Sequence, residues 1–377
     1  MKLSNLIWIF AVILCLAAIV PVVQAAMECA EVPFNVPRSQ GEMAKDPCMQ
    51  DVMMLCNSGE LWEYSGSGWI RRQETFPAGN DLLFYEYMFF YSSSEGAFMA
   101  AVQYLNPTRW RFWKYTTVWE QITPDFTGPD AREYPAYTWD NNRQRLVMFG
   151  GSDYYSGLPD NETWEWDGSQ WEQKTPASPP PSQSRAAMVD APMLGAVQLL
   201  GEDRLNHPGY MAVWTWDGTD WSYDAGSAAV APVHKSPTVI RDTTLQRTAM
   251  FGGYLPGSDP VITSDLWIWD GLVWTDATSG DAPTPRIDGP GVFVDEHLVI
   301  SGGEVELSGF LNLCDTWTYN DADGWEQVCT VPGSTVYSER VAMVWDPVES
   351  RGVLITPVNT LPVVYEWRNH AWCDLVD

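Results

Sequence analysis

A tryptophan that recurs about every fifty residues is the feature of this sequence that most limits the fold. Each copy closes a short segment in which two aromatic residues stand two positions apart, so both point to the same face of a strand. In three copies an Asp-Gly pair directly follows the second aromatic residue, which favours a two-residue hairpin turn. The closing residues are Trp69, Trp119, Trp171, Trp221, Trp274, Trp325 and Trp372. The sequence therefore predicts seven similar β-hairpins.

A second hairpin is predicted upstream of each tryptophan segment. Its second strand is apolar and, in the clearest copies, ends in Gly-Gly, as at Met250-Phe251-Gly252-Gly253. Such a pair permits close backbone approach at a strand end, and it lacks the spacing and following helix of a nucleotide-binding loop. Two hairpins in each repeat predict sheets of four antiparallel strands.

The order of apolar strand, Gly-Gly, variable loop and Trp-x-Trp-Asp-Gly-x-x-Trp resembles the kelch repeat of exported bacterial proteins. It is also similar to the central propeller of galactose oxidase. The resemblance covers residues 37–377, is strong in the third, fifth and sixth copies and is poor in the second. It implies an all-β fold, a seven-bladed kelch-like β-propeller of four-stranded antiparallel blades.

The residues before the repeats have the order of a secretory signal. Lys2 precedes an apolar run from Leu6 to Val20, and small residues lead to Ala25, after which we expect cleavage. The run is shorter than the ~20 residues that span a bilayer, so an uncleaved anchor is the lesser interpretation. We expect a signal peptide over 1–25 and one propeller domain over 26–377, secreted, periplasmic or at the cell surface, without membrane insertion. The expected blades are approximately 26–73, 74–122, 123–174, 175–224, 225–277, 278–330 and 331–377.

The formal charge of −28 restricts the partners. Such a surface repels phosphate backbones, so nucleic acid is excluded as an expected partner. The carboxylates either keep the protein soluble or, in a second interpretation, some of them hold Ca²⁺. No other cofactor is expected.

The expected ligand face follows from blade topology. In a four-stranded blade, the links from the second to the third strand (b–c) and from the fourth strand to the next blade (d–a) lie on one face of the ring. These links are long and variable here, whereas the a–b and c–d turns are short, and variable loops on a repeated scaffold usually carry function. The candidate ligand-binding residues are Tyr154, Tyr155, Asp160, Asp203, His207, Tyr210, Tyr254, Asp259, Glu304 and Glu306.

Tyrosines beside carboxylates and amides suit sugar rings, and they suit peptide partners equally well. We therefore expect an exported, non-enzymatic recognition scaffold that binds a carbohydrate or a protein. One alternative is a carbohydrate-active enzyme that uses loop carboxylates, since their separation is not given by the sequence. Another is a structural or adhesive cell-surface protein.

No catalytic residue and no metal site is predicted. The sequence has neither Gly-x-Ser-x-Gly nor His-Glu-x-x-His. A copper site like that of galactose oxidase needs two histidines, two tyrosines and a cysteine free to form a thioether. Of the four histidines, His207 and His234 fall on the same expected face, but two loop histidines without a third ligand do not define a metal site.

Six cysteines follow the expected signal and predict three disulfides in an exported chain. Cys314 and Cys329 lie on either side of the hairpin turn in the sixth copy, so we expect them to pair. Cys48 and Cys56 stand at opposite ends of a strand, too far apart to join. Two arrangements remain, of which we favour Cys48 with Cys373, because the seventh blade neighbours the first, and Cys29 with Cys56.

Overall fold

The computed structural model describes short strands and their connections from residue 41 onward. The described residues are 41–45, 52–56, 61–64, 69–73, 87–92, 95–105, 108–122, 128–130, 132–153, 155–204, 206, 208–224, 231–242, 244–257, 259–289, 291–294, 296–305, 313, 315–330, 342–346, 351–358, 361–368 and 371–374. The expected signal peptide lies outside them and stays a prediction.

Seven antiparallel sheets of four strands, here blades 1 to 7, follow one another in the described part of the chain, and each pairs its strands in chain order. Blades 1 and 2 contain β1 (Gly41–Lys45), β2 (Val52–Cys56), β3 (Leu61–Tyr64), β4 (Trp69–Gln73), β5 (Tyr87–Ser92), β6 (Ala97–Leu105), β7 (Thr108–Tyr115) and β8 (Trp119–Gln121). Blades 3 and 4 contain β10 (Ala136–Asp140), β11 (Arg145–Phe149), β13 (Thr163–Trp166), β14 (Trp171–Lys174), β15 (Ala187–Ala191), β16 (Ala196–Glu202), β17 (Met211–Trp216) and β18 (Trp221–Tyr223). The second repeat, weak in sequence, is thus a complete four-stranded sheet.

Blades 5 and 6 contain β19 (Thr238–Asp242), β20 (Arg247–Phe251), β23 (Leu266–Trp269), β24 (Trp274–Asp276), β25 (Gly291–Val294), β26 (His297–Ser301), β27 (Asp315–Asn320) and β28 (Gly324–Thr330). Blade 7 contains β29 (Ala342–Asp346), β30 (Arg351–Val358), β31 (Leu361–Arg368) and β32 (Ala371–Asp374). Smaller elements are β9 (Arg132–Glu133), β12 (Ser152–Asp153), β21 (Tyr254–Leu255), β22 (Val261–Ile262) and the 3-10 helix η2 (Pro192–Leu194). Within this described portion, no helix is long and apolar enough to cross a membrane.

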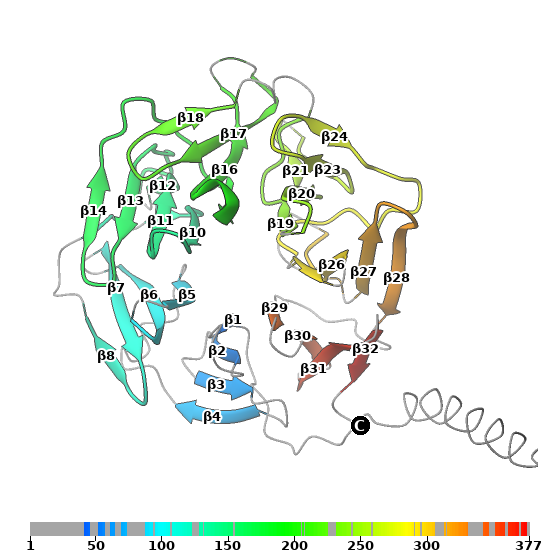
Figure 1. Ribbon diagram of the computed structural model, residues 1–377, viewed down its shortest axis with the longest axis horizontal. Helices are drawn as coiled ribbons and strands as arrows, with labels where there is room; N and C mark the ends of the chain where they lie inside the picture. The colour runs from blue at the N-terminus through cyan, green and yellow to red at the C-terminus, as the bar shows by residue number, and fades with distance from the viewer. Residues whose placement is uncertain are drawn as a thin grey trace, which may run out of the picture.

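The sheets form a ring with the first strand of each blade toward the centre and the fourth strand outside (Figure 1). Six neighbouring pairs of blades touch through first strands: β1 with β5, β10 with β15, β15 with β19, β19 with β25, β25 with β29, and β29 with β1. Blades 2 and 3 share an apolar cluster that includes Phe112 and Trp166. The predicted all-β propeller of four-stranded antiparallel blades is confirmed.

The repeated tryptophans form cross-strand pairs inside the blades. In every blade an aromatic residue at or next to the end of the third strand faces a tryptophan at or next to the start of the fourth, from Tyr64 opposite Trp69 to Trp367 opposite Trp372. Trp166, Trp216 and Trp269, which hold this position in blades 3 to 5, have no exposed surface. Their ring centroids lie 5.2 to 5.9 Å from those of their partners. Packing between strands and between blades accounts for these side chains.

The turn between these aromatic pairs is wider than predicted. Because Trp166 faces Trp171, four residues separate the strands, so Asp167-Gly168 is not a two-residue turn. Asp167 Oδ1 instead accepts the backbone N–H groups of Ser169 and Gln170 at 2.8 and 2.9 Å. Asp217 and Asp270 do the same in the next two blades, and these hydrogen bonds lower the pKa of both carboxyls. The side chain of Asp closes the turn, a role that sequence spacing alone did not separate from the shorter hairpin.

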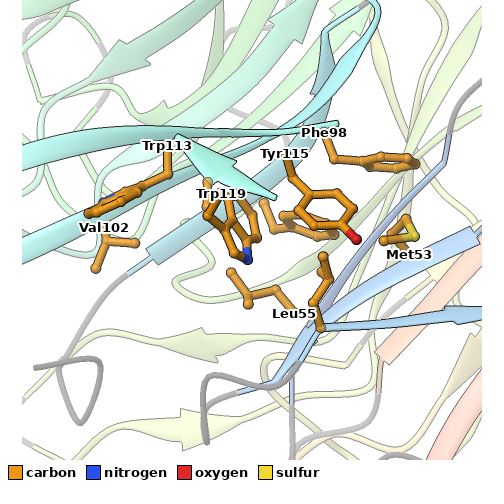
Figure 2. Packing of buried hydrophobic residues seen from close by; sticks show 10 residues of the cluster. Met53, Leu55, Phe98, Val102, Trp113, Tyr115 and Trp119 are labelled. Carbon is orange, nitrogen blue, oxygen red and sulfur yellow. The ribbon is translucent and has the colours of Figure 1, made fainter. Parts of the chain in front are cut away.

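The apolar core is divided among the interfaces between blades. Figure 2 shows the interface of blades 1 and 2, where Tyr115 and Trp119 of blade 2 lie beside Met53 and Leu55 of blade 1. Equivalent clusters join blades 3 with 4, 4 with 5 and 5 with 6. At ~1.5–3 kcal/mol for each large side chain removed from water, these clusters hold the ring together.

The disulfide predictions fall on residues or side chains outside the described set. Cys29, Cys48 and Cys314 are not among the described residues. The backbone positions of the other three are given by the ladders: Cys56 opposite Gly41, Cys329 opposite Thr316 and Cys373 opposite Glu366. All three pairings stay predictions.

Candidate recognition face

Backbone hydrogen bonds tie the b–c and d–a links to the blades. In blade 3, link strand β9 pairs with β12, so Ser152 lies opposite Glu133. In blade 5, the b–c loop forms its own small hairpin from β21 and β22, and Tyr254 bridges to Lys235 at the start of the blade. These loops therefore hold their side chains in defined positions.

A chain of backbone hydrogen bonds joins blades 3 to 6 on this face. The N–H of Arg185 donates to the carbonyl of Tyr134 over 3.1 Å. Ser236 donates to Arg185 over 3.4 Å, and Asp288 donates to Ser236 over 3.1 Å. All four residues have left-handed backbone, with φ between 51° and 59°. The same conformation at the same place in four blades makes these positions equivalent in the repeat.

A buried polar side chain precedes each of these positions by two residues. These side chains belong to Arg132, Gln183, His234 and Arg286, at 3%, 1%, 2% and 1% exposure. Aligning the repeats on their arginines in sequence pairs Arg185 with Arg132, which is two residues out of register. The residue at the position equivalent to Arg132 is Gln183. Only the backbone geometry reveals this equivalence, because the links that precede the two residues differ in length.

Arg286 forms the most complete version of this contact. Its two terminal nitrogens donate to the two carboxylate oxygens of Asp315 at 2.7 and 2.8 Å, and Nη1 also donates to the carbonyl of Gly302 at 2.7 Å. A bidentate pair of this kind is both strong and directional. It joins the link into blade 6 to the ends of β26 and β27.

Arg132 repeats the contact in blade 3. It donates to the carbonyl of Gly150 at 3.1 Å and to Glu162 Oε2 at 2.8 Å, and it lies 2.9 Å from Asp160 Oδ2. Burial raises the pKa of Asp160 despite the nearby guanidinium. Burial also acts to raise the pKa of Glu162, but hydrogen bonds from Arg132 and Trp164 outweigh it and leave this pKa below its ordinary value. Asp160, predicted as a ligand contact, thus lies in a structural ion-pair network.

Blade 4 replaces both charges with neutral residues. Gln183 Oε1 accepts the N–H of Glu202 at 2.9 Å. The place of the acid, opposite the end of the second strand, is taken by Ala212, which faces Gly201. The loss of the base and of the acid in the same blade avoids a buried charge without a partner.

Blade 5 carries a titratable version of the pair. His234 Nδ1 lies 2.8 Å from the carbonyl of Pro232, and a carbonyl can only accept, so Nδ1 bears a proton. The other nitrogen, Nε2, faces Asp265 Oδ2 at 3.5 Å, and the side chain has no exposed surface. Burial lowers the pKa of His234, with Pro232 and Asp265 acting in the opposite direction. The imidazole is therefore neutral near pH 7.

We expect the His234–Asp265 pair to make the folded protein less stable as the pH falls. Because the folded pKa of His234 lies below its ordinary value near 6.5, the unfolded chain takes up the proton first as the pH falls through that value. The stability contributed by neutral His234 is present above this pH and decreases below it, by at most about 1.4 kcal/mol per pH unit for one proton. His234→Gln, which copies blade 4, should remove this component from urea unfolding curves recorded between pH 7 and 5. Equal slopes for both proteins would contradict the assignment.

The structure leaves four of the predicted ligand residues accessible on this face. Tyr155 is 73% exposed and Tyr210 is 37% exposed. Asp259 is exposed in the b–c loop of blade 5, and Tyr254 is partly exposed at the start of β21. Tyr154, His207 and Glu306 lie outside the described residues.

Two further candidates take part in hydrogen bonds that hold the loops. Asp203 is 1% exposed and accepts the hydroxyl of Tyr223 at 2.7 Å and the N–H of Asn206 at 2.9 Å. Burial and Asp203 together raise the pKa of Tyr223 to about 12, so its hydroxyl remains a donor. Glu304 exchanges two backbone hydrogen bonds with Ile287, both at 2.9 Å. These contacts show how the loops are held.

Sequence reasoning missed apolar residues on the same loops. Leu158 beside Tyr155 is 68% exposed, and Val261 beside Asp259 is 57% exposed. Nearer the ring centre, the guanidinium carbon of Arg185 lies 3.4 Å from the ring centroid of Tyr134. No sequence pattern distinguishes an exposed loop leucine from a buried one, so only the folded structure identifies them.

Among the described side chains, no group of three or more His, Cys, Asp or Glu is placed to hold a metal ion. The second interpretation of the acidic charge, a Ca²⁺ site, therefore stays a prediction.

Comparison with known proteins places the fold. No protein-family model matches the chain. The "Rab9 effector protein with kelch motifs" of Xenopus laevis is 24% identical over 182 residues, which cover 45% of this chain and 49% of that protein. The chain thus spans about half the length of this curated relative. The solved structure of YjhT, a kelch-type propeller, matches with a TM-score of 0.52 at 12% identity, covering 92% of this chain and 99% of that one.

Proposed function

We propose, from the premise that this chain is a kelch-type β-propeller, that it is a protein-recognition scaffold whose partner binds the b–c and d–a loops. The observation that carries the proposal is the set of exposed side chains on the b–c loops of three consecutive blades. These are Tyr155, Leu158, Tyr210 and Val261. Large side chains left in water on adjacent loops are typical of an interaction surface.

The rigidity of these loops supports binding. Backbone pairing of β9 with β12 and of β21 with β22 fixes the loops before a partner arrives. A partner then loses little affinity to loop ordering, and tyrosines with two side-chain torsions add contact area at low entropy cost. The pair of Tyr134 and Arg185 adds two residue types that are enriched at interface hot spots.

The net charge of the protein and its proposed export restrict the class of partner that it meets. With a formal charge of −28, the protein attracts basic partners over long distances. We propose that recognition takes place outside the cytoplasm, in keeping with the secretory signal expected over residues 1–25. A carbohydrate is the second candidate ligand, favoured by the exposed rings of Tyr155 and Tyr210.

Site-specific photocrosslinking on the surface of the producing cell tests the proposal. A crosslinker at position 259 should capture a partner, whereas one at position 118, on an exposed c–d turn of blade 2, should not. Capture should disappear in the variant Tyr155→Ser, Leu158→Ser, Val261→Ser, because truncating each central contact costs roughly 1–2 kcal/mol and three together weaken affinity at least about 100-fold.

Met193→Ser, Leu194→Ser is the matched control, because it removes exposed apolar side chains from the opposite face. Capture that survives the triple variant, or that is lost in the control, would contradict the proposed face. A glycan array run with the same proteins separates the two ligand classes. Sugar binding abolished by Tyr155→Ala, without any protein crosslink from position 259, would favour the carbohydrate.

A further inference from the structure

A cavity of about 460 Å³ lies between blades 5 and 6 on the opposite face of the ring, where the a–b and c–d turns are found. Three turns form it: the a–b turn of blade 5, the a–b turn of blade 6 and the c–d turn of blade 6. Its lining residues are Thr244, Leu245, Arg247, Phe293, Glu296, His297, Asn320, Asp321, Ala322 and Asp323. The b–c and d–a face of the proposed function contributes none of them.

The arginine in the cavity is already paired. Arg247 Nε lies 2.9 Å from Asp242 Oδ2, whose side chain is fully buried, and Nη1 lies 2.6 Å from Asp321 Oδ2. Burial opposes the charge of Arg247, but these two carboxylates raise its pKa above the ordinary value. The guanidinium is therefore fixed by two acids and adds no net positive charge to the cavity.

The histidine in the cavity lies beside a fixed side-chain amide. Asn320 Oδ1 accepts the N–H groups of Ala322 and Asp323, both at 2.8 Å, and this fixes the orientation of the amide. The amide nitrogen Nδ2 must then donate, and it lies 3.0 Å from His297 Nε2. The same amide nitrogen also donates to Asp323 Oδ2 at 3.2 Å.

Two carboxylates at the rim lack a cation. Among the described residues, no Lys, Arg or His forms an ion pair with Glu296 or with Asp323, and both are exposed. Beside them, Leu245 is 59% exposed and Phe293 is partly exposed, which provides an apolar wall. An apolar wall next to carboxylates that form no ion pair with a described cation is complementary to a cation at the end of a hydrocarbon stem.

We propose that this cavity binds a lysine or arginine side chain of a protein partner. The stem lies against Leu245 and Phe293, and the charged end reaches Glu296 and Asp323. The long-range attraction of a chain with a charge of −28 brings basic partners to this face as well. The inference goes beyond the proposed function, because it concerns the other face and its own residues.

Titrations of the purified protein with short blocked peptides test the inference. The probes are acetyl-Gly-Lys-Gly-amide and its norleucine counterpart, which keeps the stem and lacks the charge, each followed by ligand-observed NMR at low ionic strength. The lysine peptide should bind and the norleucine peptide should not. Glu296→Gln and Asp323→Asn should each weaken binding by about two- to fivefold, the range for an exposed ion pair, and the double variant by about tenfold.

Glu120→Gln, an exposed acid on the outer strand β8 of blade 2, is the matched control and should bind the lysine peptide as the wild type does. Equal binding of the two peptides, an unchanged affinity in the double variant or no binding at millimolar concentration would each overturn the inference. A separate arm uses spermidine alone. Binding of spermidine without binding of the lysine peptide would assign the cavity to a free polyamine and overturn the proposal of a protein partner.

Discussion

Arg286→Gln is expected to lower the free energy of unfolding by about 3–5 kcal/mol, because it leaves the carboxylate of Asp315 without its charged partner in the protein interior. Arg286 has no exposed side-chain surface and Asp315 is 13% exposed. The carbonyl of Gly302 loses a donor at the same time. Urea unfolding followed by tryptophan fluorescence measures the change, since the chain contains 21 tryptophans.

The natural sequence of blade 4 provides a matched control. The double variant Arg286→Gln, Asp315→Ala copies the neutral combination of Gln183 and Ala212, so it should destabilise less than Arg286→Gln alone. Arg204→Met removes an exposed pair with Glu202, whose value is about 0–1 kcal/mol. If Arg286→Gln cost no more than Arg204→Met, the buried pair would not hold blade 6 in place.

Gly252→Ala is expected to lower the free energy of unfolding by more than about 3 kcal/mol. Gly252 has φ of +64°, and a Cβ there would lie 2.5 Å from the carbonyl oxygen of Arg286 in the link to blade 6. The left-handed backbone costs an alanine about 1–2 kcal/mol. Relief of the contact must also move a link whose carbonyl accepts the N–H of Gly253 at 2.8 Å. Thermal and urea unfolding of the variant measure the loss.

Two other glycines separate these contributions. Gly271 has φ of +102° with open space around the added Cβ, so Gly271→Ala should show only the backbone cost, about 1–3 kcal/mol. Gly257 has no positive φ, and the nearest atom to its added Cβ is 4.0 Å away, so Gly257→Ala should change stability by less than about 0.5 kcal/mol. Equal effects at Gly252 and Gly271 would show that the contact between blades adds nothing.

The opposite outcomes for Asp203 and Leu158 show why the candidate site was only partly predictable. Asp203 has the chemistry of a ligand contact, but the loop folds back and buries its carboxylate against Tyr223. Leu158 has the chemistry of a core residue, yet it stays in water at the loop surface. Loop residues have no periodicity, so their residue type does not indicate which way they face.

The sequence by itself determined the features that depend on neighbours along the chain. Aromatic residues two positions apart placed the tryptophan pairs on one strand face, and Gly-Gly marked the strand ends where a link approaches closely. Only the tertiary structure decided the equivalence of Gln183 with Arg132 and the cavity between blades 5 and 6. These features join segments from separate links and turns, and their geometry follows from loop lengths and from the packing of one blade on the next.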